Sequence, residues 1–155
     1  MSPVPIEVRT SPTGRGVFAT APIPANQLLI QYTGPLLRYE QTTPQTLALQ
    51  IGPNLYMGES TGPDDFVNHS CNPNAAIIIN GTDVKLISLR SIDAGEQITF
   101  DYSTTMDEDD FEFDCLCNSP NCRRRIRDFK HLPPELKRQY MKMGIVPDYN
   151  RKYAV

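Results

Sequence analysis

The sequence contains no long hydrophobic run and no excess of basic side chains. Its apolar stretches, such as Ala75–Ile79, are far shorter than the ~20 residues that a membrane-spanning helix needs, which excludes a transmembrane protein. The 15 basic against 18 acidic side chains give a net charge of −3, the wrong sign for a protein that neutralises many phosphates. We therefore expect no direct nucleic-acid partner and no membrane partner.

The first residues also lack the basic start and apolar stretch of a secretory signal peptide. We expect an intracellular protein, cytoplasmic or, in a eukaryote, nuclear. Tryptophan is absent, and the 14 prolines and 9 glycines disfavour an all-helical bundle. At 155 residues the chain has a length that one hydrophobic core organises, so we expect one domain.

Charge is distributed unevenly along the chain. Residues 1–106 carry 5 basic and 9 acidic side chains, residues 107–114 carry 6 acidic and no basic ones, and residues 115–155 carry 10 basic and 3 acidic ones. The acidic block at 107–114 has the composition of a solvated loop. The alternative is that it attracts a lysine-rich tail such as that of a histone.

Short β-rich runs separated by turn residues dominate the first hundred residues. The first are Ile6–Thr10, Gly16–Ala19 and Gln27–Tyr32. Two more runs flank Asn80-Gly81, a dipeptide suited to positive φ in a tight turn, so residues 75–89 predict a β-hairpin. These patterns indicate a mostly β protein.

One helix is predicted after the cysteines. Residues 133–135, Pro-Pro-Glu, can open it, and Gly144 can end it. Its apolar face, which we expect to pack on the domain, consists of Leu136, Tyr140 and Met143. The tail from residue 147 to residue 155 is expected to be loosely held.

The four cysteines lie in two places, Cys71 alone and a C-x-C-x4-C cluster of Cys115, Cys117 and Cys122. Three closely spaced thiolates can bind one soft divalent cation, and structural zinc requires a fourth ligand, for which Cys71 is the only cysteine left. Four reduced thiols or two disulfides are the alternatives, although a one-residue spacer makes pairing within the cluster awkward. His69 could compete with Cys71 as a ligand.

Two specific motifs resemble those of SET-domain protein lysine methyltransferases. They are Asn-His-Ser-Cys-Asn-Pro-Asn at 68–74 and Ile-Thr-Phe-Asp-Tyr at 98–102, and the cysteine cluster follows them as in that family. Upstream, Gly-Arg-Gly at 14–16 looks like the family's first cofactor-binding segment, and Tyr-Thr-Gly at 32–34 looks like its tyrosine-containing strand. The chain is similar to a minimal member with a post-SET zinc-binding cluster.

The resemblance implies a mostly β SET-domain fold of small curled sheets, with a pseudoknot between the 68–71 segment and the C-terminal segment. A short zinc-binding segment and a helix follow. The implied division is a SET domain at residues 1–106 and a post-SET segment with the C-terminal helix at residues 107–155, in one structural unit. After the last cysteine the family commonly has Arg-Gly, where this chain has Arg123-Arg124-Arg125.

The implied reaction is transfer of a methyl group from S-adenosylmethionine to a lysine side chain of a protein, with a histone tail as one candidate. Tyr102 matches the family's active-site tyrosine, and Tyr32 matches a second tyrosine of the lysine channel. Phe100 matches the position that tunes the room in this channel. A phenylalanine there implies space for a second or third methyl group.

The resemblance also implies which residues bind the cofactor and the metal. The residues expected to hold S-adenosylmethionine are Arg15, Gly16, Asn68 and His69. The ligands expected for one structural zinc ion are Cys71, Cys115, Cys117 and Cys122. The zinc-bound segment would then fold over the lysine channel, so that metal binding and catalysis depend on each other.

Two functions of other classes stay open at this point. One is a catalytically silent SET-fold module that contains zinc and binds peptide or cofactor, although the intact Tyr102, Tyr32 and Asn68-His69 speak against it. The other is a small zinc-binding interaction protein without a cofactor site, which predicts no binding of S-adenosylmethionine.

Overall fold

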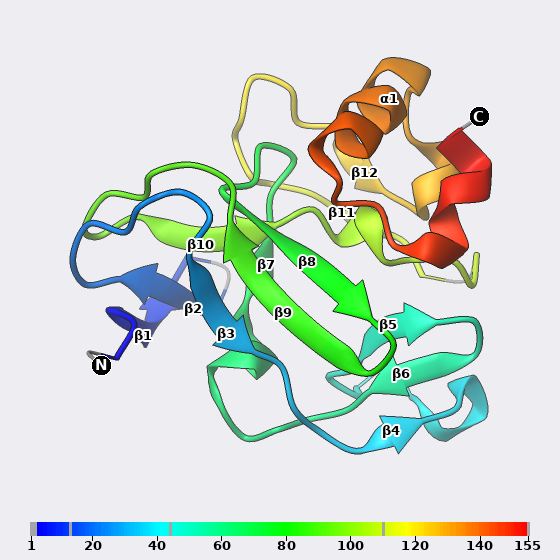
Figure 1. The fold of residues 1–155 in the computed structure, drawn as a ribbon, viewed down its shortest axis with the longest axis horizontal. Coiled ribbons are helices and arrows are strands. Elements are labelled where there is room, and N and C mark those ends of the chain that lie inside the picture. The colour runs from blue at the N-terminus through cyan, green and yellow to red at the C-terminus, as the bar shows by residue number, and fades with distance from the viewer. Residues whose placement is uncertain (1–2, 13, 44, 110, 155) are drawn as a thin grey trace.

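The computed structural model describes residues 3–12, 14–43, 45–109 and 111–154. Short strands and turns make up most of the chain (Figure 1), as the sequence predicts. The strands are β1 (Ile6–Ser11), β2 (Gly14–Ala19), β3 (Leu28–Gln31), β4 (Leu36–Leu37), β5 (Leu49–Gly52), β6 (Leu55–Met57), β7 (Asn68–His69), β8 (Ala75–Asn80), β9 (Asp83–Ser88), β10 (Gln97–Phe100), β11 (Phe113–Asp114) and β12 (Arg125–Ile126). The helices are α1 (Pro134–Met143) and the 3₁₀ helices η1 (Tyr39–Gln41), η2 (Pro63–Phe66), η3 (Tyr102–Thr104), η4 (Phe129–His131) and η5 (Asp148–Ala154).

The described strands form several small sheets. Their orders are β1-β2-β10-β7, β3-β9-β8, β4-β6-β5 and β11-β12. Most pairs are antiparallel, but β7 lies parallel to β10, with Thr99 opposite Asn68 and Phe100 opposite His69. This pairing places the two SET-like motifs side by side, although they are far apart in the sequence.

The predicted hairpin is present as β8 and β9, with one change in its turn. Asn80 pairs with Asp83, so the loop consists of Gly81 and Thr82 and not of Asn80-Gly81. Only Gly81 of the loop has positive φ, at 64°. The turn therefore needs a glycine at its first loop position, where a side chain would be strained.

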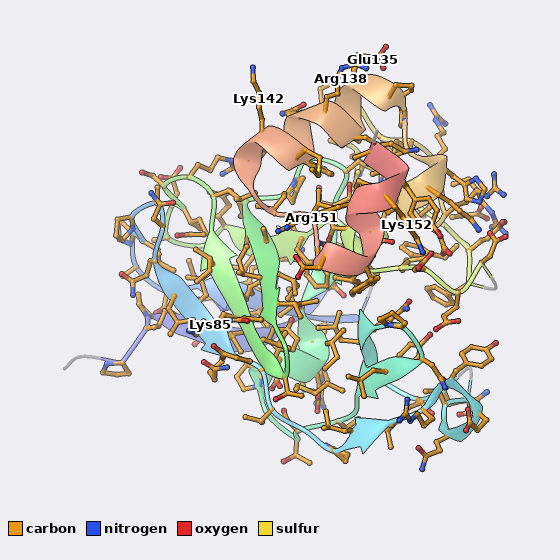
Figure 2. All side chains as sticks on the ribbon, turned by 45° about the vertical axis from the view of Figure 1, so that its right-hand side comes forward. Lys85, Glu135, Arg138, Lys142, Arg151 and Lys152 are labelled. Atoms are coloured by element: carbon orange, nitrogen blue, oxygen red, sulfur yellow. The ribbon has the colours of Figure 1, made fainter. Side chains whose placement is uncertain are left out.

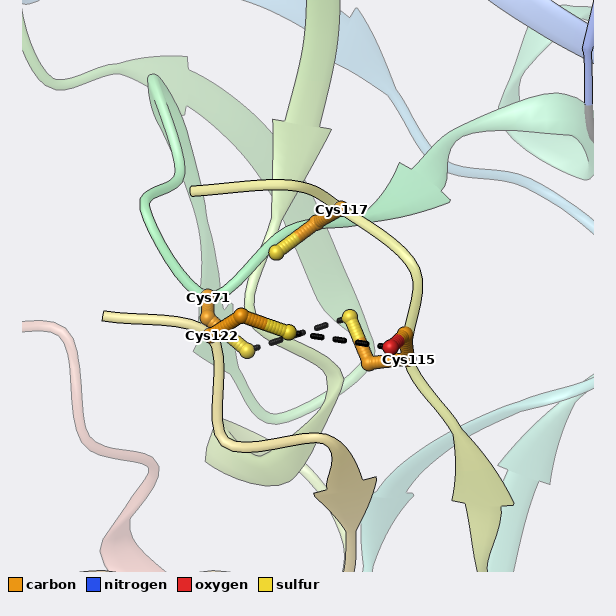
Figure 3. A group of neighbouring side chains, drawn as sticks. All are labelled: Cys71, Cys115, Cys117 and Cys122. Carbon is orange, nitrogen blue, oxygen red and sulfur yellow. Dashed lines mark hydrogen bonds between the residues drawn. The ribbon is translucent and has the colours of Figure 1, made fainter. Parts of the chain in front are cut away.

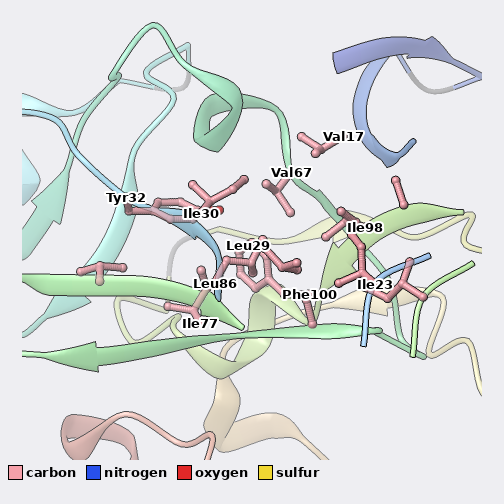
Figure 4. Packing of buried hydrophobic residues seen from close by; sticks show 14 of the residues in the cluster. Val17, Ile23, Leu29, Ile30, Tyr32, Val67, Ile77, Leu86, Ile98 and Phe100 are labelled. Carbon is pink, nitrogen blue, oxygen red and sulfur yellow. The ribbon is translucent and has the colours of Figure 1, made fainter. Parts of the chain in front are cut away.

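The main core lies between these sheets. In β9 the side chains alternate, with Val84, Leu86 and Ser88 buried, as expected for a strand with one face against the core. Figure 4 shows the core side chains meeting between β2, β3, β8, β9 and β10. Among those that it labels are Val17, Leu29, Ile77, Leu86, Ile98 and Phe100.

The predicted helix is confirmed as α1, which ends where Gly144 adopts the left-handed conformation at φ 72°. Tyr140 is buried, but Met143 is 41% exposed, so the predicted apolar face is shorter than expected. Arg138 and Lys142 point outward from the helix (Figure 2). No helix in the described part of the chain is long and apolar enough to cross a membrane.

The expectation of a loosely held tail is wrong for the described residues up to 154. Residues 148–154 form η5, in which Asn150 is fully buried. The Asn150 side-chain amide donates to the carbonyl oxygens of Thr104 at 2.9 Å and Met106 at 3.4 Å. Tyr153 and Ala154 pack against an apolar cluster that also includes Phe129 and Tyr140.

Candidate active site and metal centre

Tyr102 lies just after the end of β10 and is held from both ends. Its backbone N–H donates to Nδ1 of His69 at 3.0 Å, and its hydroxyl donates to the carbonyl oxygen of Val67 at 2.6 Å. Burial raises the pKa of Tyr102 to about 12, so the phenol stays protonated near neutral pH. Because its one proton goes to Val67, the hydroxyl oxygen faces any ligand as an acceptor.

Tyr32 follows β3 and reaches the same space as Tyr102. Its hydroxyl oxygen is buried and has no hydrogen-bond partner among the described residues. Burial, together with the nearby Tyr102, raises its pKa well above the usual value. A buried hydroxyl without a partner costs free energy, so this group is suited to a ligand that supplies the missing hydrogen bond.

The sequence predicts Tyr102, Tyr32 and Phe100 as one catalytic set, and all three line one cavity of about 650 Å³. The Phe100 and Tyr102 rings lie 4.8 Å apart between centroids. At the cavity rim, exposed apolar side chains gather, including Tyr39, Leu47 and Phe111. The cavity is thus lined both by buried aromatic side chains and by exposed apolar ones.

The charged side chains among the described lining residues of this cavity are all acidic. Its described lining residues include no lysine, arginine or histidine. Its acidic members are Glu40, Asp64, Asp65, Glu108 and Asp128. A cationic ligand is therefore favoured over an anionic one at its mouth.

The residues predicted to hold the cofactor lie at the junction of β2, β7 and β10. The side-chain amide of Asn68 donates to the carbonyl oxygen of Arg15 at 2.9 Å and to Oε1 of Gln97 at 2.8 Å. A Cβ at Gly16 would clash with the Gln97 amide. The guanidinium of Arg15 lies over the ring of Phe66, 5.4 Å from its centroid. These contacts bring Arg15, Gly16 and Asn68 together, and they show that position 16 is a glycine because the Gln97 and Asn68 side chains fill the space beside it.

The ring of His69 faces away from this junction. Its side chain is only 4% exposed, and burial lowers its pKa to about 4, so the ring is neutral. Since Nδ1 accepts from Tyr102, the proton sits on Nε2, which lies 3.4 Å from Sγ of Cys71. The 3.6 Å approach of Nδ1 to Asp101 is consequently not an ion pair.

The four cysteines come together as one cluster. Their Sγ atoms all lie within 4.8 Å of one another, and those of Cys71 and Cys115 are 3.9 Å apart. Zinc bound to four thiolates at about 2.3 Å requires Sγ atoms about 3.8 Å apart, so this donor set fits a tetrahedral zinc ion. Figure 3 shows the side chains pointing inward from the loop at Cys71 and from the segment of Cys115, Cys117 and Cys122. The cluster could hold a metal.

The surroundings of Cys71 suit a metal-bound thiolate. Burial raises the pKa of its thiol to about 11, so a cation is needed to displace its proton at neutral pH. The backbone N–H of Arg123 lies 3.4 Å from the sulfur, on which Nε2 of His69 also converges. His69 thus contacts a ligand of the proposed ion and does not join the four-sulfur group.

Sequence reasoning missed a buried polar network beside Tyr102. Asp101 is 1% exposed and accepts hydrogen bonds from Arg123, Ser103 and Tyr140. The only available signal was Asp101 within the recognised motif. The sequence marks Arg123 only as part of a departure from the family pattern, and it predicts Tyr140 as a packing residue of the helix.

The acidic block is only partly a solvated loop. Glu112 pairs with Arg125 and Arg127, and Asp109 pairs with Lys130 and His131. Within the described residues of the block, Glu108 and Phe111 line the cavity, and Glu108 is the acidic one of the two. Asp110 lies outside the described residues.

Comparisons with known proteins agree with this arrangement. The SET domain family model matches residues 14–103, which is more than half of the chain. The variant-silencing SET domain-containing protein of Plasmodium falciparum is 32% identical over 135 residues, covering 74% of this chain and 5% of that protein. The H3 lysine-4 specific histone-lysine N-methyltransferase of Saccharomyces cerevisiae is 33% identical over 126 residues, covering 70% of this chain and 12% of that protein.

A solved structure has a similar fold. The crystal structure of KRYPTONITE in complex with mCHG DNA and SAH matches with a TM-score of 0.65 and 25% sequence identity, over 77% of this chain and 28% of that one. The chain spans only a small part of each of these proteins. Since the matched region includes both motifs and the strands that bring them together, the chain belongs to the SET domain family.

Proposed function

We propose that this chain is a protein lysine N-methyltransferase that uses S-adenosylmethionine and contains one structural zinc ion. The observation that carries the proposal is the pair of buried tyrosine hydroxyls at one cavity. The Tyr102 hydroxyl is fixed as an acceptor by Val67, and the Tyr32 hydroxyl has no partner among the described residues. Two such groups can orient a lysine amine at the end of an aromatic channel.

S-adenosylmethionine would supply a methyl group carried on a positively charged sulfur. The bond from the lysine nitrogen to the methyl carbon forms while the bond from sulfur to that carbon breaks, with the three atoms in line. A free lysine with a pKa of ~10.4 must first release a proton to water. The apolar wall at Phe100 and the positively charged sulfur of S-adenosylmethionine would disfavour the ammonium form at the reacting end and oppose the acidic side chains of the lining, so no dedicated base is needed.

The cofactor is expected on the β7 side of this channel. Support comes from the Asn68 amide, which joins β2 to β10, and from the SAH named for the matching KRYPTONITE structure. Approach of the two substrates from opposite ends of a narrow channel would provide the in-line geometry. Such orientation is worth up to ~7–11 kcal/mol of the barrier.

We propose a basic protein segment as the substrate, with a histone tail as the first candidate. The acidic lining of the cavity and the exposed apolar groups at its rim support a lysine flanked by further cationic residues. The name of the yeast relative, which specifies histone H3 lysine 4, makes H3 the natural starting substrate. A substrate of this kind would place the protein in the nucleus of a eukaryotic cell.

The test is incubation with radiolabelled S-adenosylmethionine and either histones or total cell lysate, followed by mass spectrometry of the labelled band. Tyr102→Phe should remove most turnover and leave cofactor affinity nearly unchanged, because its hydroxyl acts at the amine. Tyr153→Phe, which removes a hydroxyl remote from the cavity lining, is the matched control. Cofactor binding without any transfer would favour the silent module, and no cofactor binding would favour the zinc-binding interaction protein.

A further inference from the structure

We infer that the C-terminal segment, residues 134–154, is a positioning element for the proposed transferase site and acts on it through two tyrosine hydroxyls. The inference rests on the proposed function, which it deepens. Tyr140 of α1 reaches the segment that carries Tyr102, and Tyr149 of η5 reaches the wall of the substrate cavity. Both tyrosines lie beyond residues 14–103, which the family model matches.

The first contact point is Asp101, the residue directly before Tyr102. The Tyr140 hydroxyl donates to Oδ2 of Asp101 at 2.8 Å, and the two residues are 3% and 1% exposed. The other oxygen, Oδ1, accepts from Nη2 of Arg123 at 2.8 Å and from the backbone N–H of Ser103 at 3.0 Å. A carboxylate held at both oxygens has one orientation, and it caps the 3₁₀ helix in which Tyr102 lies.

This orientation fixes where the Tyr102 ring points. The Tyr102 hydroxyl contacts Val67 and its backbone N–H contacts His69, so small rotations of the backbone at 101–103 would break both hydrogen bonds. Tyr140 is the group from α1 that holds this backbone through Asp101. Loss of its hydroxyl would leave Oδ2 of Asp101 buried with one donor fewer, a costly change for a buried charge.

The second contact point is the wall of the cavity. The Tyr149 hydroxyl lies 2.6 Å from the carbonyl oxygen of Thr105 and 3.1 Å from that of Gln50. With a single proton it donates to one of them at a time, and the shorter distance favours Thr105. Both Gln50 and Thr105 line the cavity, Gln50 from β5 and Thr105 from the segment after Tyr102. Tyr149 therefore holds the Thr105 wall by a hydrogen bond and lies beside the Gln50 wall, at the junction of two walls that face the substrate.

The Gln50 side chain reinforces the same junction. Its Oε1 accepts from the backbone N–H of Asp107 at 2.8 Å, and its Nε2 donates to Glu108 at 3.3 Å. The spacing between β5 and residues 105–108 thus depends on these hydrogen bonds of Gln50 and on the contacts of the Tyr149 hydroxyl from η5. A loosened junction would change first how peptide fits between these walls, and it would reach Tyr102 only through Thr105, which contacts the Tyr102 carbonyl oxygen at 3.3 Å.

The two contact points predict two different kinetic effects. Tyr140→Phe should lower kcat about tenfold or more with little change in the KM for peptide, because it acts through Asp101 on Tyr102. Tyr149→Phe should raise the KM for peptide by about threefold to tenfold and lower kcat by a smaller factor, since it reaches Tyr102 only through Thr105. Both changes keep the ring and remove one oxygen, so folding should survive. Tyr153→Phe in η5 is the control and should change neither constant.

The experiment measures kcat and KM of the full chain and these variants on a histone peptide, with zinc content and cofactor affinity measured alongside. Hydrogen exchange of residues 100–106 is measured on the same samples without substrate. Exchange there should be faster in Tyr140→Phe than in Tyr153→Phe. Unchanged exchange in Tyr140→Phe, or equal changes of both kinetic constants in the Tyr140 and Tyr149 variants, would overturn the inference. A wild type that transfers no methyl group refutes the proposed function, whereas the exchange result still decides the positioning role.

Discussion

The chain before residue 107 and the chain after it are stabilised by different interactions. The first part has a continuous apolar core to which three sheets contribute, including Val17, Leu86 and Ile98, each fully buried. The second part has two small apolar clusters, four cysteine sulfurs gathered with Cys71 from the first part, and exposed ion pairs around Glu112.

The difference assigns different tasks to the two parts. A large apolar core tolerates local changes of charge or metal, because its stability is spread over many side chains. The second part depends on a few directional contacts, and it borders the cavity that Tyr102 lines. We therefore expect the first part to act as a scaffold and the second part to control whether the site is assembled.

We expect loss of the proposed zinc ion to produce the largest difference in hydrogen exchange between the two parts. Cys117→Ser removes one of the four sulfurs of the proposed zinc site, and the binding free energy of structural zinc is on the order of 10 kcal/mol. We expect loss of stoichiometric zinc, rapid hydrogen exchange in residues 113–126, and no methyl transfer. The β8–β9 hairpin should keep its slow exchange. Elemental analysis and exchange mass spectrometry measure both results.

Chelation of the wild-type protein is the matching treatment and should reproduce the variant. Ser119→Ala is the control, because Ser119 contacts the Cys117 sulfur at 2.9 Å without belonging to the four-sulfur group. Unchanged zinc content in Cys117→Ser would refute the proposed four-cysteine zinc site. Unfolding of the sheets at the same chelator concentration would show that the two parts are one cooperative unit.

A substitution that creates a cavity in the core of the first part should have the opposite effect: it should lower the stability and leave the zinc content unchanged. Leu86 is fully buried in β9, opposite Ile77 and Ile30. Leu86→Ala should lower the free energy of unfolding by about 2–5 kcal/mol and leave zinc content unchanged. Urea unfolding followed by circular dichroism measures the first, and elemental analysis the second. A loss of zinc from the folded variant would contradict the division into two parts.

Much of the fold could be predicted because its signals are local. The β8–β9 hairpin follows from two β-rich runs and a glycine, and α1 follows from a proline at its start and Gly144 at its end. The tail was predicted wrongly because Asn150 and Tyr149 are polar residues whose partners lie about 45 residues upstream in the sequence. A polar side chain carries no sign in the sequence that it is buried against a distant carbonyl group.

The site could be predicted to a similar extent. The motifs that contain Tyr102 and the cysteines are recognisable as strings, and the structure brings them into one region. The contact from Tyr140 to Asp101 joins two residues whose spacing follows no motif. In the sequence, Tyr140 was indistinguishable from a tyrosine that only packs on the domain.

A smaller effect is expected at Phe100, where the scaffold itself lines the cavity. The resemblance to this family implies that a tyrosine at this position would hold a water molecule in the room for a further methyl group. Phe100→Tyr should change the free energy of unfolding by less than about 1 kcal/mol, since its new hydroxyl would face the cavity. The final product should shift from di- or trimethyllysine toward monomethyllysine at a similar first-step rate. Only monomethyllysine from the wild type at exhaustive reaction, read by mass spectrometry, would refute this prediction.

The smallest expected change in the free energy of unfolding concerns Arg124, in the backbone between the cysteine cluster and β12. Arg124 has a φ of 68°, in the left-handed region, at the position where the family commonly has glycine. Its carbonyl oxygen accepts from the backbone N–H of Cys115 at 2.7 Å, so a hydrogen bond to the cysteine segment holds Arg124 in this conformation. A side chain in this region costs roughly 1–2 kcal/mol, whereas glycine avoids that strain.

Arg124→Gly should therefore differ from an ordinary replacement by glycine. The strain that it relieves is offset by the larger conformational entropy of a glycine in the unfolded chain, about 0.5–1 kcal/mol. The net change should lie between zero and a gain of about 1 kcal/mol. Arg138→Gly, at an exposed position inside α1, has no strain to relieve and should lose about 1 kcal/mol. Urea unfolding of both zinc-loaded variants measures the difference. Equal losses in the two would mean that the left-handed turn beside the cysteine cluster holds no strain.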